Sequence, residues 1–273
     1  MKNVPLVLLL LIGGIFINAD AYAQTSIFDA HVHYSQPDWA VYSPAAIFRF
    51  FDEAQVQWAM VSSTPDEGTL RLYELAPQRI VPILRPYRTR GDMGTWFKDP
   101  SILAYVEQRF QKGIYRGIGE FHLPAGEAKS EVVKGFIRLA ARSGIFLYAH
   151  TDEIGIEELL NLEPKVRILW AHAGFSATTQ KIGLLLDRFP TLFVETSIRN
   201  DYASGGKLNP NWRDLFLRHP DRFMIGSDTW TTSRWESFVE IHKEIRAWLN
   251  QLPPNISGNL SIHNARRLSA EKP

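Results

Sequence analysis

Short apolar runs rich in valine, isoleucine and aromatic residues recur along the chain and alternate with amphipathic stretches. This alternation is typical of consecutive βα units, in which buried parallel strands are followed by helices that cover them. The segments between the runs are expected to be helical, and no Ser/Gly-rich linker or low-complexity tract divides them. Eight runs predict strands: Ile27–His33, Val56–Thr64, Arg79–Tyr87, Tyr115–Leu123, Ile145–Thr151, Arg167–Gly174, Leu192–Ile198 and Arg222–Thr229.

The longest helical candidate, Ser233–Leu252, supports a barrel. It places Trp235, Phe238, Ile245 and Leu249 on one stripe, as a helix packed outside a barrel requires. Eight strands with intervening helices in roughly 250 residues match the size of a (β/α)8 barrel. A doubly wound open sheet would more often show a glycine-rich first turn. We therefore predict an α/β protein with one domain, a (β/α)8 TIM barrel over residues 24–273.

The first 23 residues have a different pattern. A short basic start is followed by an apolar run over residues 4–17 and by small residues at Ala21-Tyr22-Ala23. The run is shorter than the about 20 residues that a transmembrane helix needs, and the order of regions is typical of a cleavable signal peptide. We predict cleavage before Gln24 and export, to the periplasm or outside the cell, with no membrane anchor afterwards. An uncleaved N-terminal anchor is the alternative.

Composition narrows the expected partners. The chain has 273 residues, of which 45% are hydrophobic and 22% charged, so it can bury a large core and is not disordered. A formal net charge of +1 gives no basic surface for nucleic acid, so we expect a small-molecule substrate. Cysteine is absent, which excludes disulfides, thiolate ligands and thiol nucleophiles. Any metal must therefore bind histidine, aspartate or glutamate.

Candidate metal ligands lie at the ends of several predicted strands. His31 and His33 are two residues apart on a strand, so both side chains point the same way and can share one ion. Because the C-terminal ends of barrel strands open on one mouth, ionisable residues placed there are expected to meet. Burying such groups without partners is costly, which favours a functional role over packing. Four further strands end in such a residue: Glu120, His150, His172 and Asp228.

The remaining histidines divide into two kinds. His122 lies two residues beyond Glu120 on the same predicted face and is a candidate substrate contact. His219, His242 and His263 fall on helices or loops, where surface or packing roles are expected.

Two arginines are further candidates for substrate binding. Arg85 ends the third strand and Arg199 follows the seventh. A guanidinium group can bind a carboxylate or phosphate through two parallel hydrogen bonds. A solvated loop arginine is the commoner alternative at both positions. Trp39, Trp96 and Trp230 lie in predicted loops and are candidate walls of a pocket.

The order of these residues resembles the amidohydrolase superfamily of metal-dependent barrels, over almost the whole mature chain. The shared order is His-x-His on the first strand, an acid on the fourth, histidines on the fifth and sixth, and aspartate on the eighth. The C-terminal segment 264–268 is also similar to the last helix of the amidohydrolase-related branch. The resemblance implies a catalytic role for Asp228 and His172, and it implies these metal ligands: His31, His33, Glu120, His150, His172 and Asp228.

Glu120 departs from the best-known members, which carry a carboxylated lysine there. Glutamate at this place is similar to the TatD-type nucleases and some phosphotriesterase relatives. We expect its carboxylate to bridge two divalent ions without modification of the protein. The alternative is one ion held by His31, His33 and Asp228 with either His150 or His172. Imidazole and carboxylate ligands suit Zn²⁺, with manganese, iron or cobalt as substitutes.

The resemblance implies hydrolysis of a small-molecule ester, lactone, amide or phosphoester by metal-activated water. Asp228 is expected to orient the water, accept its proton and pass it to the leaving group, while the metal or His172 polarises the scissile bond. One alternative is a zinc-dependent non-oxidative decarboxylase, similar to aminocarboxymuconate-semialdehyde decarboxylase. A TatD-like nuclease is another, although the near-zero net charge counts against it. A non-catalytic binder is the least favoured, because the ligand set is intact.

Overall fold

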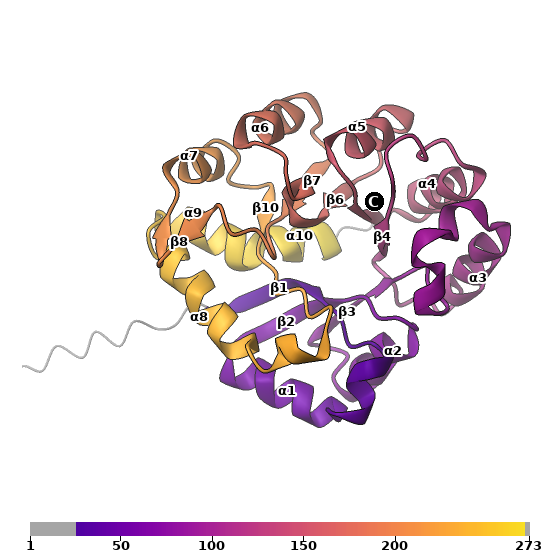
Figure 1. Ribbon diagram of the computed structural model, residues 1–273, viewed down its shortest axis with the longest axis horizontal. Helices are drawn as coiled ribbons and strands as arrows, with labels where there is room; N and C mark the ends of the chain where they lie inside the picture. Colours follow the sequence, from indigo (N-terminus) through magenta and orange to yellow (C-terminus); the bar gives the residue numbers. More distant parts are fainter. Residues whose placement is uncertain (1–25, 271–273) are drawn as a thin grey trace, which may run out of the picture.

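The computed structural model describes residues 26–270, which form a ring of parallel strands surrounded by helices (Figure 1). Neighbouring strands follow one another in chain order. The ring consists of β1 (Ile27–Val32), β2 (Val56–Val61), β3 (Ile80–Leu84), β4 (Gly117–His122), β5 (Phe146–His150), β6 (Ile168–Trp170), β7 (Leu192–Glu195) and β10 (Phe223–Met224). All eight predicted strands are present, each shorter than predicted, and the barrel fold is confirmed. The predicted signal peptide, residues 1–23, lies outside the described residues.

Two backbone hydrogen bonds join β1 to the segment that directly follows β10. The Ala30 N–H donates to the Ile225 carbonyl at 2.9 Å, and the Asp228 N–H donates to the His31 carbonyl at 2.7 Å. The other adjacent strands pair in parallel ladders. Because all strands run the same way, their C-terminal ends meet at one mouth.

The outer helices cover the strands with their apolar faces. They are α1 (Pro44–Glu53), α2 (Glu67–Leu75), α3 (Pro100–Phe110), α4 (Glu131–Ser143), α5 (Glu153–Leu162), α6 (Thr179–Arg188), α7 (Pro210–Arg218) and α8 (Phe238–Leu249). Several begin at a side-chain cap: the Ser130 hydroxyl accepts from the Val133 N–H at the start of α4, for example. Between β7 and α7, β8 (Ala203–Ser204) and β9 (Lys207–Leu208) form a small antiparallel hairpin.

The helix predicted over Ser233–Leu252 is shorter in the structure. The segment Thr232–Trp235 forms a 3-10 turn, η5, and α8 begins only at Phe238. The predicted apolar stripe is nevertheless buried, because the Trp235 ring stacks on Phe238 at a centroid distance of 5.2 Å. Among residues 26–270, no helix has the length and hydropathy needed to cross a bilayer.

The C-terminal elements cover one end of the ring. These are α9 (Pro254–Gly258), the π-helical turn η6 (Asn259–His263) and α10 (Asn264–Ala270). Ala265 and Leu268 of α10 pack with Phe28, Met60 and Met224 in one apolar cluster inside the barrel. This end, which we call the base, is therefore filled, and the site lies at the opposite mouth.

Candidate metal centre

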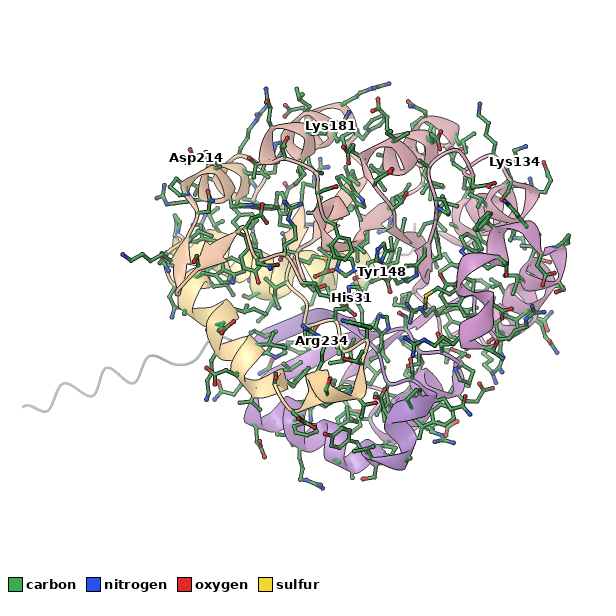
Figure 2. All side chains as sticks on the ribbon, in the orientation of Figure 1. His31, Lys134, Tyr148, Lys181, Asp214 and Arg234 are labelled. Carbon is green, nitrogen blue, oxygen red and sulfur yellow. The ribbon has the colours of Figure 1, made fainter. Side chains whose placement is uncertain are left out.

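The predicted ligands converge at the mouth of the barrel. Figure 2 shows His31 in the middle of the ring, whereas Lys134, Lys181 and Asp214 lie on its periphery. All six ligands come from strands or from the turns that directly follow them, and all but the half-buried His150 are buried. They are His31 and His33 at the end of β1, Glu120 on β4, His150 on β5, His172 in the 3-10 turn η4 (Ala171–Gly174) and Asp228 after β10.

Three donor atoms are spaced like ligands of one tetrahedral ion, and a fourth lies near two of them. Two ligand atoms of a tetrahedral zinc ion lie about 3.3 Å apart when each bond is about 2.0–2.1 Å. The Nε2 atoms of His31 and His33 are 3.1 Å apart. Glu120 Oε2 lies 3.4 and 3.2 Å from these two atoms, and Asp228 Oδ1 lies 3.6 and 3.2 Å from them. The separations within His31, His33 and Glu120 fit three ligands of one ion, and Asp228 Oδ1 lies at similar distances from the two imidazole nitrogens.

The hydrogen bonds behind the two β1 histidines leave their Nε2 atoms unprotonated. His31 Nδ1 lies 2.8 Å from the Glu195 carboxylate, and His33 Nδ1 bonds the Ser62 carbonyl oxygen. Because these oxygens can only accept, each Nδ1 carries a hydrogen, and in its neutral form each ring turns the Nε2 lone pair toward the centre. Asp228 Oδ1 is buried without a hydrogen-bond partner. Lone pairs that face one another in this way lack a cation, and the donor set therefore fits a divalent metal.

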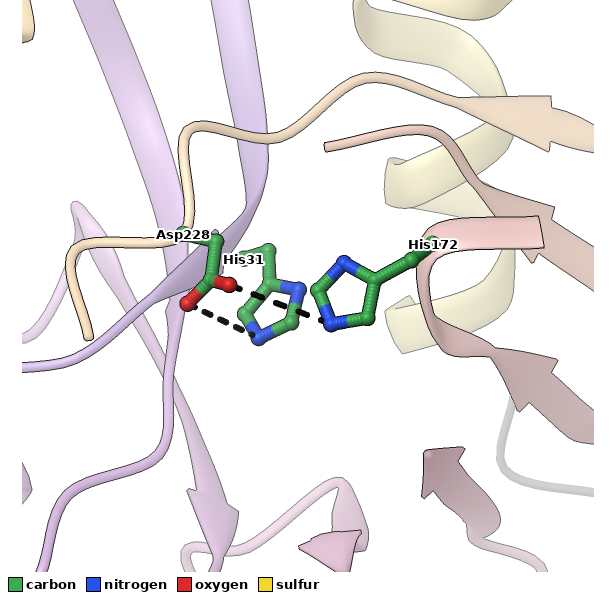
Figure 3. Close-up of side chains that lie close together, drawn as sticks. All are labelled: His31, His172 and Asp228. Atoms are coloured by element: carbon green, nitrogen blue, oxygen red, sulfur yellow. Dashed lines mark ion pairs between the residues drawn. The ribbon is translucent and has the colours of Figure 1, made fainter. Parts of the chain in front are cut away.

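His172 and His150 approach the centre from the other side. Figure 3 shows His31 and His172 side by side, each joined to Asp228 by an ion pair, and His172 Nε2 lies 3.8 Å from Asp228 Oδ2. His172 Nδ1 lies 3.1 Å from the Ser197 carbonyl oxygen, so its Nε2 is also an acceptor. His150 differs, because its Nδ1 lies 2.7 Å from Glu120 Oε1, a hydrogen-bond distance.

The electrostatics of the cluster favour a positive charge at its centre. Burial alone would raise the pKa of Glu120, but His31 and Arg85 hold that pKa well below its usual range. Asp228 follows the same pattern: burial opposes ionisation, and His31 and His33 lower its pKa nevertheless. Burial lowers the pKa of His31, and the carboxylates of Asp228, Glu120 and Glu195 raise it well above 6.5. The same carboxylates that raise the pKa of His31 would also attract a metal ion.

Backbone strain is concentrated around the site. Six non-glycine residues among 26–270 have positive φ, and four of these line the cavity at the mouth: His172, Phe175, Ile198 and Asp228. Such conformations cost on the order of 1–3 kcal/mol each and persist where the surrounding structure enforces them. The left-handed φ of 54° at His172 turns its ring into the mouth directly after β6 ends.

Two glycines allow the elements that carry the acids to approach closely. A Cβ atom at Gly119 would lie 2.7 Å from Tyr148 Cβ, and one at Gly226 would lie 2.6 Å from His31 Cβ. Gly119 directly precedes Glu120, and Gly226 stands two residues before Asp228; both acids are candidate ligands. In the sequences GIGE and IGSD, a glycine that allows close packing against a neighbouring strand is therefore followed by a candidate ligand.

A cavity of about 720 Å³ opens above the candidate ligands. Its wall includes Arg85, Arg90, His122 and Trp230. Burial lowers the pKa of His122 to about 3, so this ring is neutral near neutral pH. Trp96 does not line the cavity, because it is buried against other aromatic rings. The position of His122 and Trp230 is compatible with the predicted substrate contacts.

The two candidate arginines have different environments. Arg85 is only 5% exposed, so the solvated-loop alternative is wrong for it. Its Nη2 lies 2.8 Å from Glu120 Oε2, and its Nε donates to the Glu120 carbonyl at 3.1 Å. For Arg199 substrate binding stays a prediction, and this buried side chain is not among the residues that line the cavity. Its guanidinium binds the Asp201 carboxylate and the carbonyls of Ala173 and Ala177, which ties loops together.

Sequence reasoning left Glu195 without a role. This fully buried residue ends β7, where its Oε2 accepts from His31 Nδ1 at 2.8 Å and from the Ser197 hydroxyl at 2.9 Å. The signal was available, because an acid that ends an apolar strand had already identified other ligands. Asp29 is similar: it accepts from the His31 backbone N–H at 3.0 Å and lies 3.0 Å from His242 Nε2, so His242 is the packing residue that we expected.

No protein-family profile matches the sequence, and no curated protein is significantly similar to it. The fold, however, is shared with solved structures. A probable 2-pyrone-4,6-dicarboxylic acid hydrolase from Acinetobacter baumannii with bound citric acid is 14% identical, with a TM-score of 0.61 and coverage of 90% of this chain and 100% of that one. Amidohydrolase 2 from Bifidobacterium longum subsp. infantis is 16% identical, with a TM-score of 0.58 and coverage of 90% and 99%. A TatD homologue from Escherichia coli K12 is 16% identical, with a TM-score of 0.61 and coverage of 90% and 98%. At these identities the likeness shows the fold, which is the one that the resemblance to the amidohydrolase superfamily implies.

Proposed function

We propose that the protein is a metal-dependent hydrolase that acts on a small-molecule ester, lactone, amide or phosphoester. The observation that carries the proposal is a set of buried donor atoms: the Nε2 atoms of His31 and His33 lie 3.1 Å apart, and Glu120 Oε2 and Asp228 Oδ1 each lie 3.2–3.6 Å from both. Hydrolase and amidohydrolase descriptions among proteins that share the fold support it.

His31, His33, Glu120 and Asp228 would hold the ion, with His172 beside them. Their nitrogen and oxygen donors suit Zn²⁺. When bound, a divalent ion supplies Lewis-acid chemistry, which makes water acidic enough to react near neutral pH and polarises an electrophilic oxygen.

Asp228 is the proposed general base. Its strongly lowered pKa keeps the carboxylate ionised, so that it can accept a proton from the attacking water and return it to the leaving group. Its backbone φ of 50° and its N–H bond to the His31 carbonyl at 2.7 Å fix its direction. His172, with Nδ1 bonded to Ser197, is held so that Nε2 faces the reacting groups.

The cavity favours a substrate of small to moderate size that carries a polar or anionic group. Arg85 and Arg90 line it together with the aromatic side chains of Phe175 and Trp230. The citric acid bound to the Acinetobacter protein is a carboxylate ligand of a related fold, which supports the inclusion of carboxylates in any substrate survey.

A second candidate function is zinc-dependent non-oxidative decarboxylation. The observation that favours it is the pair of arginines, Arg85 and Arg90, in the wall of the cavity, where a substrate carboxylate can bind. Nuclease activity finds support in the TatD homologue among the fold neighbours, but the net charge of +1 disfavours a long phosphate-binding surface.

The test is a survey of reactions with metal-reconstituted protein. Lactones, esters, amides, phosphoesters and aromatic acids are incubated with Zn²⁺-loaded, Mn²⁺-loaded and chelator-stripped protein. We expect hydrolysis of at least one class with loaded protein and at least a hundredfold loss after chelation. Release of carbon dioxide from an aromatic acid would replace the hydrolase by the decarboxylase. Equal activity with and without metal would contradict both. We also propose export, which the mass of the mature N-terminus tests.

A further inference from the structure

Arg85 places a positive charge directly beside the acid that was expected to bridge two ions. Its guanidinium contacts Glu120 twice, through Nη2 to Oε2 at 2.8 Å and through Nε to the backbone carbonyl at 3.1 Å. Arg85 is 5% exposed and Glu120 2%, so water screens this charge little. A second divalent ion on Glu120 would have to share the carboxylate with this cation.

Both carboxylate oxygens of Glu120 already accept from protein donors. Oε2 accepts from Arg85, and Oε1 lies 2.7 Å from His150 Nδ1. That distance is shorter than the about 3.3 Å expected between two ligands of one zinc ion and normal for an N–H···O bond. The His150 nitrogen that faces Glu120 therefore carries a hydrogen and is not a ligand there.

His122, the remaining histidine near Glu120, is held in the wrong tautomer for a ligand. The Tyr87 hydroxyl accepts from the His122 backbone N–H at 2.7 Å and lies 3.1 Å from His122 Nδ1. Tyr87 is fully buried, and its own proton is satisfied by donating to Nδ1. His122 Nε2 then carries the ring hydrogen, so the group Glu120, His122 and His150 does not present three lone pairs to a second ion.

The formal charge of the cluster matches one divalent cation. The charged side chains in contact with the candidate ligands, or among them, are four carboxylates (Asp29, Glu120, Glu195 and Asp228) against two guanidiniums (Arg85 and Arg234), which leaves −2. One divalent ion cancels this charge. Two would leave +2 in a buried site, and an uncompensated buried charge is costly.

We propose that the centre holds one divalent cation, among His31, His33, Asp228 and Glu120, and that Arg85 occupies the place of a second cation beside Glu120. This inference rests on the proposed metal-dependent function and replaces the two-ion arrangement that the sequence led us to expect. Arg85 is accordingly a positioning residue that fixes Glu120 and sets the metal count.

The test counts metal in the full-length protein and in two variants. Each protein is stripped with chelator, reloaded with excess Zn²⁺ or Mn²⁺, freed of unbound metal and analysed by elemental mass spectrometry. We expect about one ion per chain in the wild type and in Arg85→Lys, which keeps the charge. We expect a rise toward two in Arg85→Gln, which removes it. Electron paramagnetic resonance of the Mn²⁺ forms should show an isolated ion in the first two proteins and a spin-coupled pair in the third.

The possible results separate the inference from the function on which it rests. Two coupled ions in the wild type would overturn the inference and leave metal-dependent hydrolysis standing. No bound ion in the wild type would overturn both. One ion in a folded Arg85→Gln would refute the role of Arg85. If that variant does not fold, as judged by circular dichroism, two ions in Arg85→Lys would refute it instead, because the charge is retained there.

Discussion

The base and the mouth of the barrel are built on the same strands but carry opposite kinds of buried side chain. At the base, Phe28, Met60, Leu169 and Met224 pack with Leu268 in an apolar cluster, and each is 2% exposed or less. At the mouth, the candidate ligands are buried almost as deeply, yet they are imidazoles and carboxylates that face one another.

The free energies of the two ends differ accordingly. Burial of apolar area at the base stabilises the fold by about 25 cal/mol per Å². At the mouth, burial of charged groups and the positive φ values of His172 and Asp228 both work against folding. We infer that packing at the base stabilises the fold, whereas buried charges and strained backbone at the mouth destabilise it. Substitutions at the two ends should therefore separate stability from function.

The largest expected effect is the loss of turnover in Asp228→Asn. The amide cannot accept the proton of the attacking water, so turnover of the substrate found in the survey should fall about 10²- to 10⁴-fold. Metal content should be largely retained. Asp214→Asn, on the periphery of the ring, is the matched control. Undiminished turnover in Asp228→Asn would remove this residue from catalysis.

At the base, Leu169→Ala should show the opposite pattern. Loss of a buried leucine leaves a cavity and costs about 2–5 kcal/mol of unfolding free energy, measured by urea denaturation. Metal content should not change, since the side chain lies in the apolar cluster. Leu184→Ala is the control, because Leu184 is 59% exposed on α6 and its loss should cost no more than about 0.5 kcal/mol. A parallel loss of metal in Leu169→Ala would argue that the two ends are not independent.

The same contrast explains what the sequence could reveal. Strands were predictable because apolar runs of strand length recur. The convergence of the candidate ligands was predictable because strand ends of a barrel share one mouth. Contacts between side chains of adjacent strands were not predictable. The bond between Arg85, which directly follows β3, and Glu120 on β4 depends on the register of the two strands. The burial of Arg199 likewise depends on the path of its loop. The left-handed turn at His172 has no glycine at that position, so the sequence does not signal it.

Asp66 offers a pH test on the mouth side, away from the metal centre. It begins α2 just after Thr64 and Pro65, which line the cavity. Burial raises its pKa from 3.8 to about 6, although the Tyr115 hydroxyl and Arg109 oppose this shift. Between about pH 4 and pH 6 the native state therefore holds a proton that the unfolded state has lost. Stability from this group is present below pH 4 and falls as the pH rises, by about 3 kcal/mol in all.

The measurement compares wild type with Asp66→Asn by urea denaturation at several pH values between 4 and 7. The difference in unfolding free energy should shift in favour of the variant as the pH rises, because asparagine does not ionise. Parallel curves for the two proteins would mean that the native carboxyl titrates like an unfolded one. Such a result would weaken the view that buried acids at the mouth reduce stability.

The smallest predicted effect concerns Glu195, whose carboxylate contacts both His31 of the candidate metal centre and Tyr148 of the apolar cluster at the base. His31 Nδ1 donates to this carboxylate at 2.8 Å, and the negative charge makes the opposite nitrogen a better ligand. Glu195→Gln keeps the shape but removes the charge, so Zn²⁺ affinity should fall about 10- to 100-fold, as measured by competition with a chromophoric chelator. Glu163→Gln, in the connection after α5, is the charge-matched control and should leave affinity unchanged. An equal loss of Zn²⁺ affinity in both variants would assign the effect to net charge. No loss of affinity in Glu195→Gln would show that His31 does not need the Glu195 carboxylate to bind the metal. Glu195→Gln removes a buried carboxylate and therefore lowers the negative charge that a divalent ion must balance. The metal-free variant should accordingly be slightly more stable than the metal-free wild type.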